Sequence, residues 1–342
     1  MSRARGAVVL AVLGAGLVAA LFAGVCIGAV KVPVGEVLRM AARALGFGGV
    51  AEPEATHVTI IATLRLPRVL AAALVGGSLA VAGVAMQGLF RNPMASPEIL
   101  GISAGGSLGA VAAITTGLAS ASVLVLPVAT AIGALLAAAL IYGIASTRGG
   151  TSLLFIVIAG MAVSSLFNGL VSGMLMFSKQ YELSAYLFWT MGDFEGRGWQ
   201  HLALAAPVLL PGIAVMAFFS RELNLFTLGE EGARSLGMSV ETVKRLLLAL
   251  AALVTGAAIS VAGPVGFVGL LVPHLLRLIV GPDHRTHVPA SALGGALFLL
   301  LCDLLGRSVA PPFQIRVGII TAVLGSPYLL VLVVRAQRRG RA

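Results

Sequence analysis

Runs of about 20 or more apolar residues recur along this chain, and a helix needs a run of that length to cross a lipid bilayer. The 342-residue chain is 58% hydrophobic and 11% charged, whereas a soluble domain is about a quarter charged. Too few polar side chains are present to cover the surface of a soluble core. The sequence therefore predicts an all-α, polytopic membrane protein in which residues 1–342 form a single transmembrane domain.

Ten membrane-spanning helices are predicted, and the first, at 7–30, is too long for the apolar region of a signal peptide. The other nine cover 65–90, 98–117, 121–146, 152–177, 200–220, 246–262, 264–281, 288–306 and 317–334. Residues 33–47 have a mixed, amphipathic pattern that predicts an interfacial helix. The longest polar interruption is 221–245, where the helix-compatible stretch 228–236 and the stop at Gly237 predict a cytoplasmic two-helix elbow.

The basic residues favour one orientation of these helices. If both termini are cytoplasmic, 14 of the 23 Lys and Arg residues lie inside, in agreement with the positive-inside rule and an even helix count. Those 14 are Arg3, Arg5, Arg91, Arg148, Arg221, Arg234, Lys244, Arg245, Arg277, Arg285, Arg335, Arg338, Arg339 and Arg341. We expect a multi-pass protein with both termini in the cytoplasm.

Several classes of function find little support. The sequence has no P-loop, HExxH, GxSxG or CxxC motif, and its five histidines form no ligand pattern, so neither an enzyme nor a metal site is predicted. The charge of +10 is spread over short connections, which argues against nucleic acid as a partner. An ion-driven carrier would place several carboxylates deep in its helices. This sequence does not, since Asp303 lies near a predicted helix end and can pair with Arg307, one turn away. An ion-driven carrier is therefore disfavoured.

The most informative segment, 64–105, contains RLPR, GxxLAxxGxxMQ, RNPMASPEILG and GISAG in that order, and GEEGARSLG, GPVGFVGLLVPHLLR and GSPYLL follow. Over essentially its whole length the chain resembles the FecCD-type permease family, the membrane subunits of ABC importers for iron-siderophores, haem and vitamin B12. The resemblance implies ten helices per subunit and pairing with a second permease subunit, as a homodimer here. It also implies separate ATPase subunits that hold ATP and Mg²⁺, a periplasmic or lipid-anchored substrate-binding protein, and a bacterial or archaeal cytoplasmic membrane. No cofactor is expected on this chain.

The resemblance also implies roles for individual residues. Three arginines match positions that dock the binding protein at the outer mouth, although anchoring of helix ends is the alternative: Arg65, Arg68 and Arg307. The coupling helices that enter a cleft of the ATPase match Gly229, Glu230, Glu231, Ala233, Leu236 and Gly237. The cytoplasmic gate matches Asn92, Met94, Thr151 and Ser152, which are equally ordinary turn and cap residues.

The transport pathway and its substrate are less closely specified. We expect the fifth helix to line the pathway through Ser164, Ser165, Phe167, Asn168 and Met174, with Tyr181, Trp189 and Met191 in the outer segment. These residues suit a bulky chelate that passes without tight binding. We place an iron-siderophore first, with haem or cobalamin as the alternative. A proton- or sodium-driven carrier and a membrane-embedded enzyme or scaffold are more distant alternatives.

One departure from the family pattern precedes the last helix. Family members usually read Glu-(Leu/Ile)-Pro-(Val/Ile)-Gly there, whereas this chain reads Gln314-Ile315-Arg316-Val317-Gly318. A carboxylate and a proline are lost, and a further basic residue is gained. We therefore expect the outer docking surface to differ in detail.

Overall fold

The computed structural model describes residues 3–28, 30, 32–46, 52–147, 150–310 and 313–339, and these residues are almost entirely helical. Residue 47 at the end of the predicted interfacial helix, together with Arg148 and Arg341, lies outside the described residues. The first half contains α1 (Arg3–Cys26), α2 (Val34–Ala44), α3 (Ala55–Thr59), the π-helical η1 (Ile60–Arg65), α4 (Leu66–Phe90), the 3-10 turn η2 (Pro97–Leu100), α5 (Ile102–Thr115), the 3-10 turn η3 (Leu118–Ser120), α6 (Val125–Ala145) and α7 (Leu153–Met176). The second half contains α8 (Gln180–Thr190), α9 (Trp199–Phe218), α10 (Ser220–Phe226), α11 (Gly229–Ser235), α12 (Val240–Ala262), α13 (Val268–Val280), α14 (His284–Ser308) and α15 (Val317–Arg339).

The all-α membrane fold is confirmed. Among the described residues, seven helical segments are long and apolar enough to cross a membrane, and three shorter apolar helices accompany them. Each predicted span coincides with one of these ten segments, and the predicted interfacial helix is α2. The strands β1 (Ser146–Thr147) and β2 (Gly150–Thr151) form a two-residue antiparallel hairpin in which Ser146 pairs with Thr151.

Two predicted boundaries are wrong for identifiable reasons. The second span begins at Ala55 rather than 65, because α3, η1 and α4 form one continuous helix of 36 residues. The Pro67 ring would clash with the carbonyl group of residue 63 in a regular α-helix, and the helix widens into the π-helical η1 just before it. The third span begins at Ile102 rather than 98, because Gly101 is left-handed (φ +62°).

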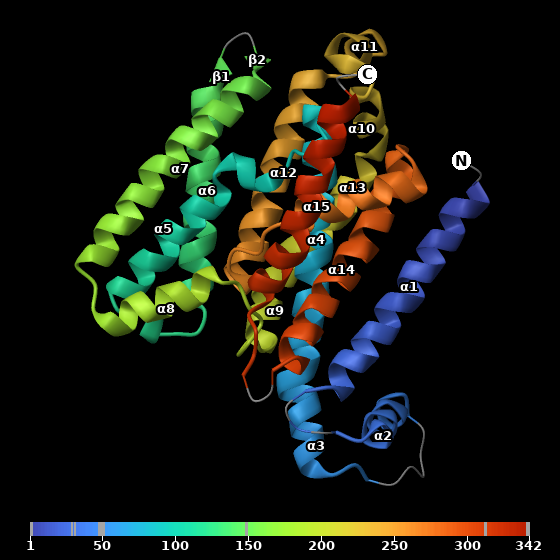
Figure 1. The fold of residues 1–342 in the computed structure, drawn as a ribbon, viewed down its shortest axis with the longest axis vertical. Coiled ribbons are helices and arrows are strands. Elements are labelled where there is room, and N and C mark those ends of the chain that lie inside the picture. The colour runs from blue at the N-terminus through green and yellow to red at the C-terminus, as the bar shows by residue number, and fades with distance from the viewer. Residues whose placement is uncertain are drawn as a thin grey trace.

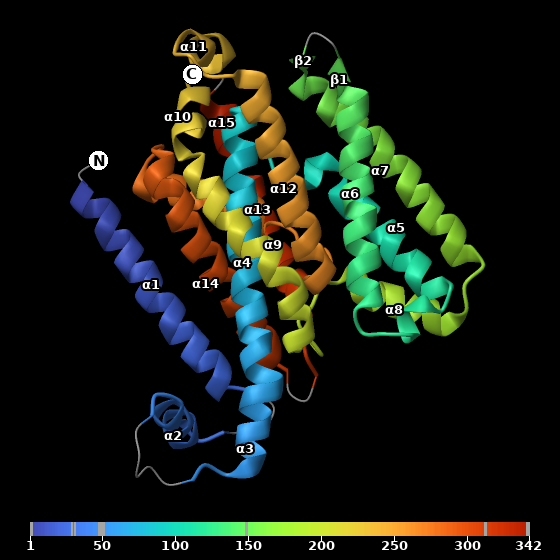
Figure 2. The same cartoon turned by 180° about the vertical axis from the view of Figure 1, so that it is seen from behind.

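α4 is the central helix of the protein (Figure 1), and most of its residues are buried. It packs against α9, α12, α13 and α14, while α1 lies on the outer side of α14 (Figures 1 and 2). Helices α5, α6, α7 and α8 form a second group beside this bundle (Figure 2). The segment that contains Tyr181, Trp189 and Met191 was not predicted as a helix, yet α8 includes the first two.

Pairs of glycines allow close crossings between helices. A Cβ atom added to Gly76 of α4 would lie 2.3 Å from the carbonyl oxygen of Gly295 in α14, and the reverse distance is also 2.3 Å. Gly105 of α5 and Gly133 of α6 meet in the same way, at 2.3 Å and 2.2 Å. Any larger residue at these four positions would push the helices apart. Such small-residue contacts replace the hydrophobic driving force that helices lack inside a bilayer.

The two ends of the protein differ in character. One end carries α10, α11 and the β1–β2 hairpin, and α1 begins and α15 ends toward it (Figure 1). The opposite end carries α2 and α3. We call these the elbow end and the α2 end.

Candidate functional site

The elbow consists of α10 and α11. It begins at Ser220, one residue before the predicted segment 221–245, and the last six residues of that segment already belong to α12. Gly237 follows α11 with a left-handed backbone (φ +84°), and the N–H groups of Gly237 and Met238 donate to the carbonyl oxygens of Arg234 and Ala233. This is the Schellman motif, which glycine favours because it has no Cβ atom. The motif turns the chain sharply from α11 into α12.

The residues expected to couple to the ATPase divide into inward-facing and outward-facing ones. Ala233 is fully buried and packs α11 onto the protein. Glu231 and Gly237 are exposed. The side chain of Leu236 is 60% exposed, and that of Leu228 at the other end of α11 is 61% exposed. Large apolar side chains at both ends of a short polar helix are typical of a surface that another protein covers.

A buried lysine ties α11 to the rest of the elbow end. Lys244 of α12 is 2% exposed, and its Nζ atom lies 2.8 Å from a carboxylate oxygen of Glu230 and 2.9 Å from one of Glu241. The same Nζ donates to the backbone carbonyl oxygen of Thr151 at 2.9 Å. One ammonium group therefore contacts the elbow, the start of α12 and the hairpin. A buried ammonium needs such partners, because an unpaired one would be costly.

The hairpin holds two of the expected gate residues. The backbone N–H of Thr151 donates to Glu241 at 3.0 Å, and its hydroxyl group lies 3.1 Å from that of Ser146. Ser152 occupies the N-cap position of α7, but its side chain makes no capping hydrogen bond. Thr151 is thus fixed by contacts with Glu241, Ser146 and Lys244. Ser152 is positioned by its backbone alone.

The other two expected gate residues lie just beyond α4. Arg91 ends α4 in a left-handed conformation (φ +48°) that is uncommon for a residue other than glycine. The side chain of Asn92 then accepts a hydrogen bond from the N–H of Met94 at 2.9 Å, which makes a compact turn. An Nη atom of Arg91 would lie 3.3 Å from a Cβ added to Gly229, so this turn lies against the start of α11.

At the α2 end, Asp303 of α14 is the centre of an ion-pair cluster. Its side chain is 1% exposed, and Arg68 of α4 donates to it through Nη2 at 2.8 Å and through Nε at 3.1 Å. The Nε atom of Arg307 lies 3.1 Å from the other carboxylate oxygen, which is the pairing that the sequence spacing allows. This cluster joins α4 to α14 inside the chain.

Arg65 and Arg307 both hold the end of α1. Arg65 donates to the carbonyl oxygens of Val25 and Cys26 at 2.8 Å and 2.7 Å and also to that of Val30. Arg307 donates to the carbonyl oxygens of Gly24 and Ile27 at 3.2 Å and 3.1 Å. The last carbonyl groups of a helix have no partner within the helix, and these guanidinium groups supply one.

The three arginines expected to dock the binding protein therefore all make contacts within the chain. They also border a cavity of about 340 Å³ at the α2 end, whose wall includes Arg197, Glu195 and Gln314. The anchoring role that sequence reasoning left open is thus present in the structure. The same three arginines also line this cavity, so their anchoring contacts do not separate them from it.

The residues that depart from the family pattern before the last helix contribute to the ion-pair cluster around Asp303. Arg316 lies 2.8 Å from Asp193, a carboxylate in the connection between α8 and α9 that sequence reasoning missed. Burial raises the pKa of Asp193, and this effect outweighs the opposing one of Arg68, the backbone N–H of Phe194 and Arg316. Gln314 accepts a hydrogen bond from Arg68 at 2.9 Å. No local sequence pattern identifies Asp193, because its partner Arg316 lies in a loop distant in the sequence.

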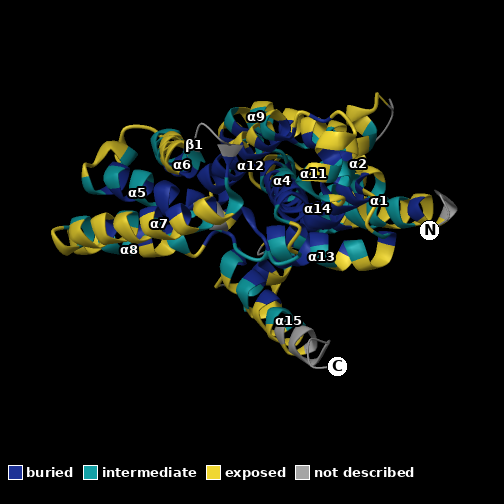
Figure 3. Ribbon diagram, turned by 90° about the horizontal axis from the view of Figure 1, so that it is seen from above, coloured by how far each residue is buried: buried dark blue, intermediate teal, exposed yellow. Residues whose placement is uncertain are grey.

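The residues expected to line the pathway lie on α7 and do not share one face. Ser164 faces inward, where its hydroxyl oxygen would lie 3.0 Å from a Cβ added to Gly101. Ser165, Asn168 and Ser172 are exposed and form a polar stripe at helical spacing along α7. Phe167 and Met174 are half-buried. In the outer segment Tyr181 is 65% exposed, whereas Trp189 is buried and stacks on Tyr186. Figure 3 shows the exposed side of α7 and α8 and, apart from the other helices, α15.

Within the described residues no group of three His, Cys, Asp or Glu side chains could hold a metal ion. The candidate site consists of a polar elbow, a hairpin and a cluster of ion pairs, separated by apolar helices. These features describe a membrane permease subunit.

Comparison with known proteins gives the same class and names the family. The FecCD transport family matches residues 16–335, and the chain belongs to that family. The cobalamin import permease BtuC of Halobacterium salinarum is 46% identical over 82% of this chain and 74% of that protein. The hemin permease HmuU of Yersinia pestis is 40% identical over 82% and 84%, and the Fe(3+) dicitrate permease FecD of Escherichia coli is 38% identical over 82% and 87%.

A solved structure described as an inward-facing metal-chelate type ABC transporter has a TM-score of 0.83 and 31% identity, over 95% of this chain and 98% of that one. The chain is thus a permease of the type II ABC importers for metal chelates. It is a transport subunit and not an enzyme, because the ATPase is a separate subunit in this family, and the family implies a substrate-binding partner as well.

Proposed function

We propose that this chain carries an iron chelate of the siderophore type across the cytoplasmic membrane of a bacterium or archaeon. A binding protein delivers the chelate to the α2 end, and the chelate leaves at the elbow end, which lies in the cytoplasm together with both termini. ATP and Mg²⁺ bind to the partner ATPase, and this chain binds no cofactor of its own.

The contacts of Lys244 support the part of this proposal in which the ATPase drives release at the elbow end. They join Glu230, on the helix expected to enter the ATPase, to Thr151, on the hairpin expected to narrow the exit. A displacement of α11 by the ATPase would therefore reach the hairpin through one side chain. Leu228 and Leu236 offer the apolar surface on which the ATPase would dock.

We further propose that a second copy of the chain packs along α7 and α15 and that the pathway lies between the copies. The stripe of Ser165, Asn168 and Ser172 would be poorly placed against lipid, where polar groups lack partners. It would suit either a water-filled path or the close packing of another helix. Val323 and Leu324 of α15 are 65% and 47% exposed, which leaves apolar surface available for the same contact.

At the α2 end we propose that the arginine-lined cavity receives carboxylates of the binding protein. Asp303 and Glu195 leave the five arginines Arg65, Arg68, Arg197, Arg307 and Arg316 incompletely neutralised, even with Asp193 counted. Approach of an acidic loop would be favoured by this excess of positive charge.

Cobalamin is the second candidate substrate, because a relative named as a cobalamin import permease is 46% identical to this chain. Uptake distinguishes the two. The permease, its ATPase and its binding protein are expressed together in cells that lack their own chelate importers, and uptake of ⁵⁵Fe-siderophore, ⁵⁷Co-cobalamin and haemin is compared. We expect ATP-dependent uptake of the iron chelate. Uptake of cobalamin alone would select the second candidate, and uptake driven by an ion gradient without the ATPase would refute the proposal.

A further inference from the structure

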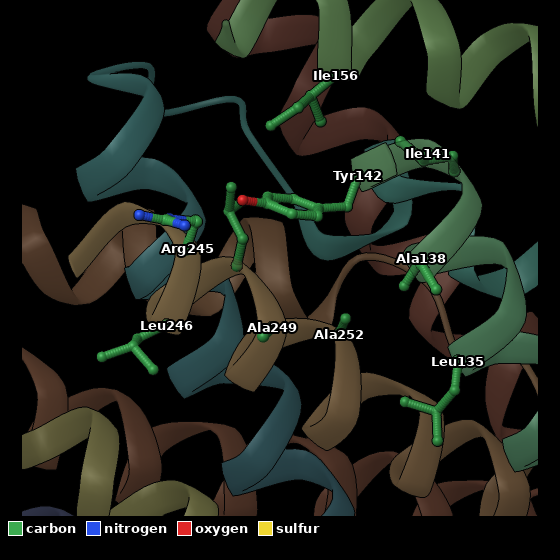
Figure 4. Close-up of a pocket in the computed structure, with 11 residues that line it drawn as sticks. Leu135, Ala138, Ile141, Tyr142, Ile156, Arg245, Leu246, Ala249 and Ala252 are labelled. Atoms are coloured by element: carbon green, nitrogen blue, oxygen red, sulfur yellow. The ribbon is translucent and has the colours of Figure 1, made fainter. Parts of the chain in front are cut away.

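A crevice of about 390 Å³ lies between α6 and α12 toward the elbow end, and Ile156 near the start of α7 also lines it (Figure 4). On α6 its lining runs from Leu135 to Tyr142, and on α12 it runs from Arg245 to Ala252. Seven residues of α-helix rise about 10 Å. The crevice is therefore a slot that extends along the helices for about two turns.

Contacts at both ends of the slot explain why it exists. Near the middle of the bundle, a Cβ added to Gly256 of α12 would lie 3.2 Å from the Cβ of Ala134 in α6, so the helices nearly touch there. At the elbow end the N–H of Thr151 donates to Glu241 at 3.0 Å and closes the gap again. Between these contacts Ala138, Ala249 and Ala252 are too small to fill the space (Figure 4).

The lining is apolar except at the elbow end, where Arg245 and Tyr142 face each other across the slot (Figure 4). Arg245 is exposed, and its Nε donates to the carbonyl oxygen of Glu241 at 3.2 Å. Among the described residues its guanidinium group forms no ion pair, whereas its neighbour Lys244 pairs with two carboxylates. The Tyr142 hydroxyl accepts from Thr151 at 3.5 Å and can donate its own proton elsewhere.

We propose that this slot binds an anionic phospholipid, with one acyl chain between α6 and α12 and the phosphate group at Arg245 and Tyr142. Both helices are long and apolar enough to span the bilayer, and Leu135 and Leu246 at the rim are 40% and 51% exposed. A lipid chain is the apolar material at that position, and it removes a void that would otherwise lack contacts. The planar donors of arginine match a phosphate group well. Placement of this lipid in the cytoplasmic leaflet rests on the orientation proposed above.

The bound lipid would lie directly beneath the hydrogen bonds that join Thr151 to Glu241 and Lys244. Its acyl chain would therefore contact α6, α12 and Ile156 of α7, close to the hairpin that joins α6 to α7.

Native mass spectrometry of the full-length permease in detergent tests the proposal, with phosphatidylglycerol and phosphatidylcholine as probes. We expect one tightly bound phosphatidylglycerol per chain. Ala249→Phe fills the slot and should weaken the binding of either lipid at least tenfold. Arg245→Gln should reduce the preference for phosphatidylglycerol about fivefold, the usual effect of one arginine near anionic lipid. Ala11→Phe on the exposed side of α1 and Arg285→Gln at the elbow end are the matched controls and should change neither.

A second measurement does not depend on the folding of these variants. A photoreactive benzoylphenylalanine replaces Leu246 in the assembled transporter in native membranes, and the product of illumination is identified. A crosslink to phospholipid is expected. A crosslink to another polypeptide, or equal lipid binding by wild type, Ala249→Phe and Arg245→Gln, would overturn the proposal. Failure of transport in the uptake assay above would leave both results unaffected.

Discussion

Glu230 on α11 and Lys244 on α12 form an ion pair of 2.8 Å, and the same lysine donates to the backbone of Thr151. The side chain of Glu230 is 35% exposed, whereas that of Lys244 is 2% exposed. The lysine is therefore the buried member of the pair. Its three contacts connect the expected ATPase surface with the expected gate.

We expect Lys244→Met to separate ATP hydrolysis from transport. Methionine keeps the unbranched shape of the side chain, one atom shorter, and removes every polar contact to Glu230, Glu241 and Thr151. The two carboxylates are partly exposed and can regain water, so the cost in stability should be about 1–3 kcal/mol. In proteoliposomes with the ATPase and binding protein, ATP hydrolysis should continue while transport per ATP falls about tenfold. Arg234→Gln, an exposed change on α11, is the control, and an unchanged ratio in Lys244→Met would contradict the proposed link.

The apolar ends of α11 provide a second test. Leu236→Asp places a charge where we expect the ATPase to cover an exposed leucine. Burial of a leucine side chain is worth about 1.5–3 kcal/mol, so affinity for the ATPase should fall at least tenfold. Co-purification and biolayer interferometry measure it. Ser235→Asp adds the same charge at the neighbouring exposed position and should have a smaller effect. If both variants bind the ATPase as wild type does, α11 is not the docking helix.

Much of the fold could be predicted from sequence, because length and apolarity alone define a membrane span. The ten spans and α2 follow from such local patterns. The start of the second span does not, because Pro67 is typical of a helix start, while here the helix continues through it by widening at η1. α8 was missed because its eleven residues are too short and too polar for a span.

The motifs placed the expected site residues on particular elements, but the direction of their side chains could not be predicted. Motif position places Ala233 on α11, yet only packing shows that it points inward, whereas Leu236 points outward. Arg65 and Arg68 lie three residues apart, but one binds carbonyl groups of α1 and the other a carboxylate of α14. Such choices depend on residues distant in the sequence.

Variants of Arg68 can distinguish docking of the binding protein from anchoring of helices within the chain. Arg68→Gln leaves Asp303 buried without one of its partners and should destabilise the protein by about 3–5 kcal/mol. The double variant Arg68→Gln with Asp303→Asn removes both charges. Arg307 then loses its carboxylate partner but keeps the carbonyl oxygens of Gly24 and Ile27, so part of the loss should be recovered. Thermal unfolding in detergent measures both variants.

The same double variant then reports on docking, once thermal unfolding shows that its fold is retained. If the cavity receives an acidic loop, association of the binding protein should be slower and less dependent on salt than with wild type. Stopped-flow fluorescence at two ionic strengths measures the rate. Identical kinetics with a restored melting temperature would assign Arg68 to anchoring only.

Asp283 gives a prediction for pH. It precedes α14 and accepts hydrogen bonds from the side chain of Asn224 at 2.8 Å and from the N–H of Arg285 at 3.0 Å. The Asn224 hydrogen bond and then that of Arg285 lower the pKa of Asp283, so its carboxylate stabilises the folded state above the unfolded pKa of about 3.9. That contribution is lost as the pH falls through the lowered folded pKa. Asp283→Ala should therefore cost about 0.5–2 kcal/mol at pH 7, the usual value for a helix cap. The difference in apparent melting temperature from wild type should stay constant down to about pH 4 and shrink below it. A difference that does not change between pH 7 and pH 3 would mean that the cap does not depend on the charge of Asp283.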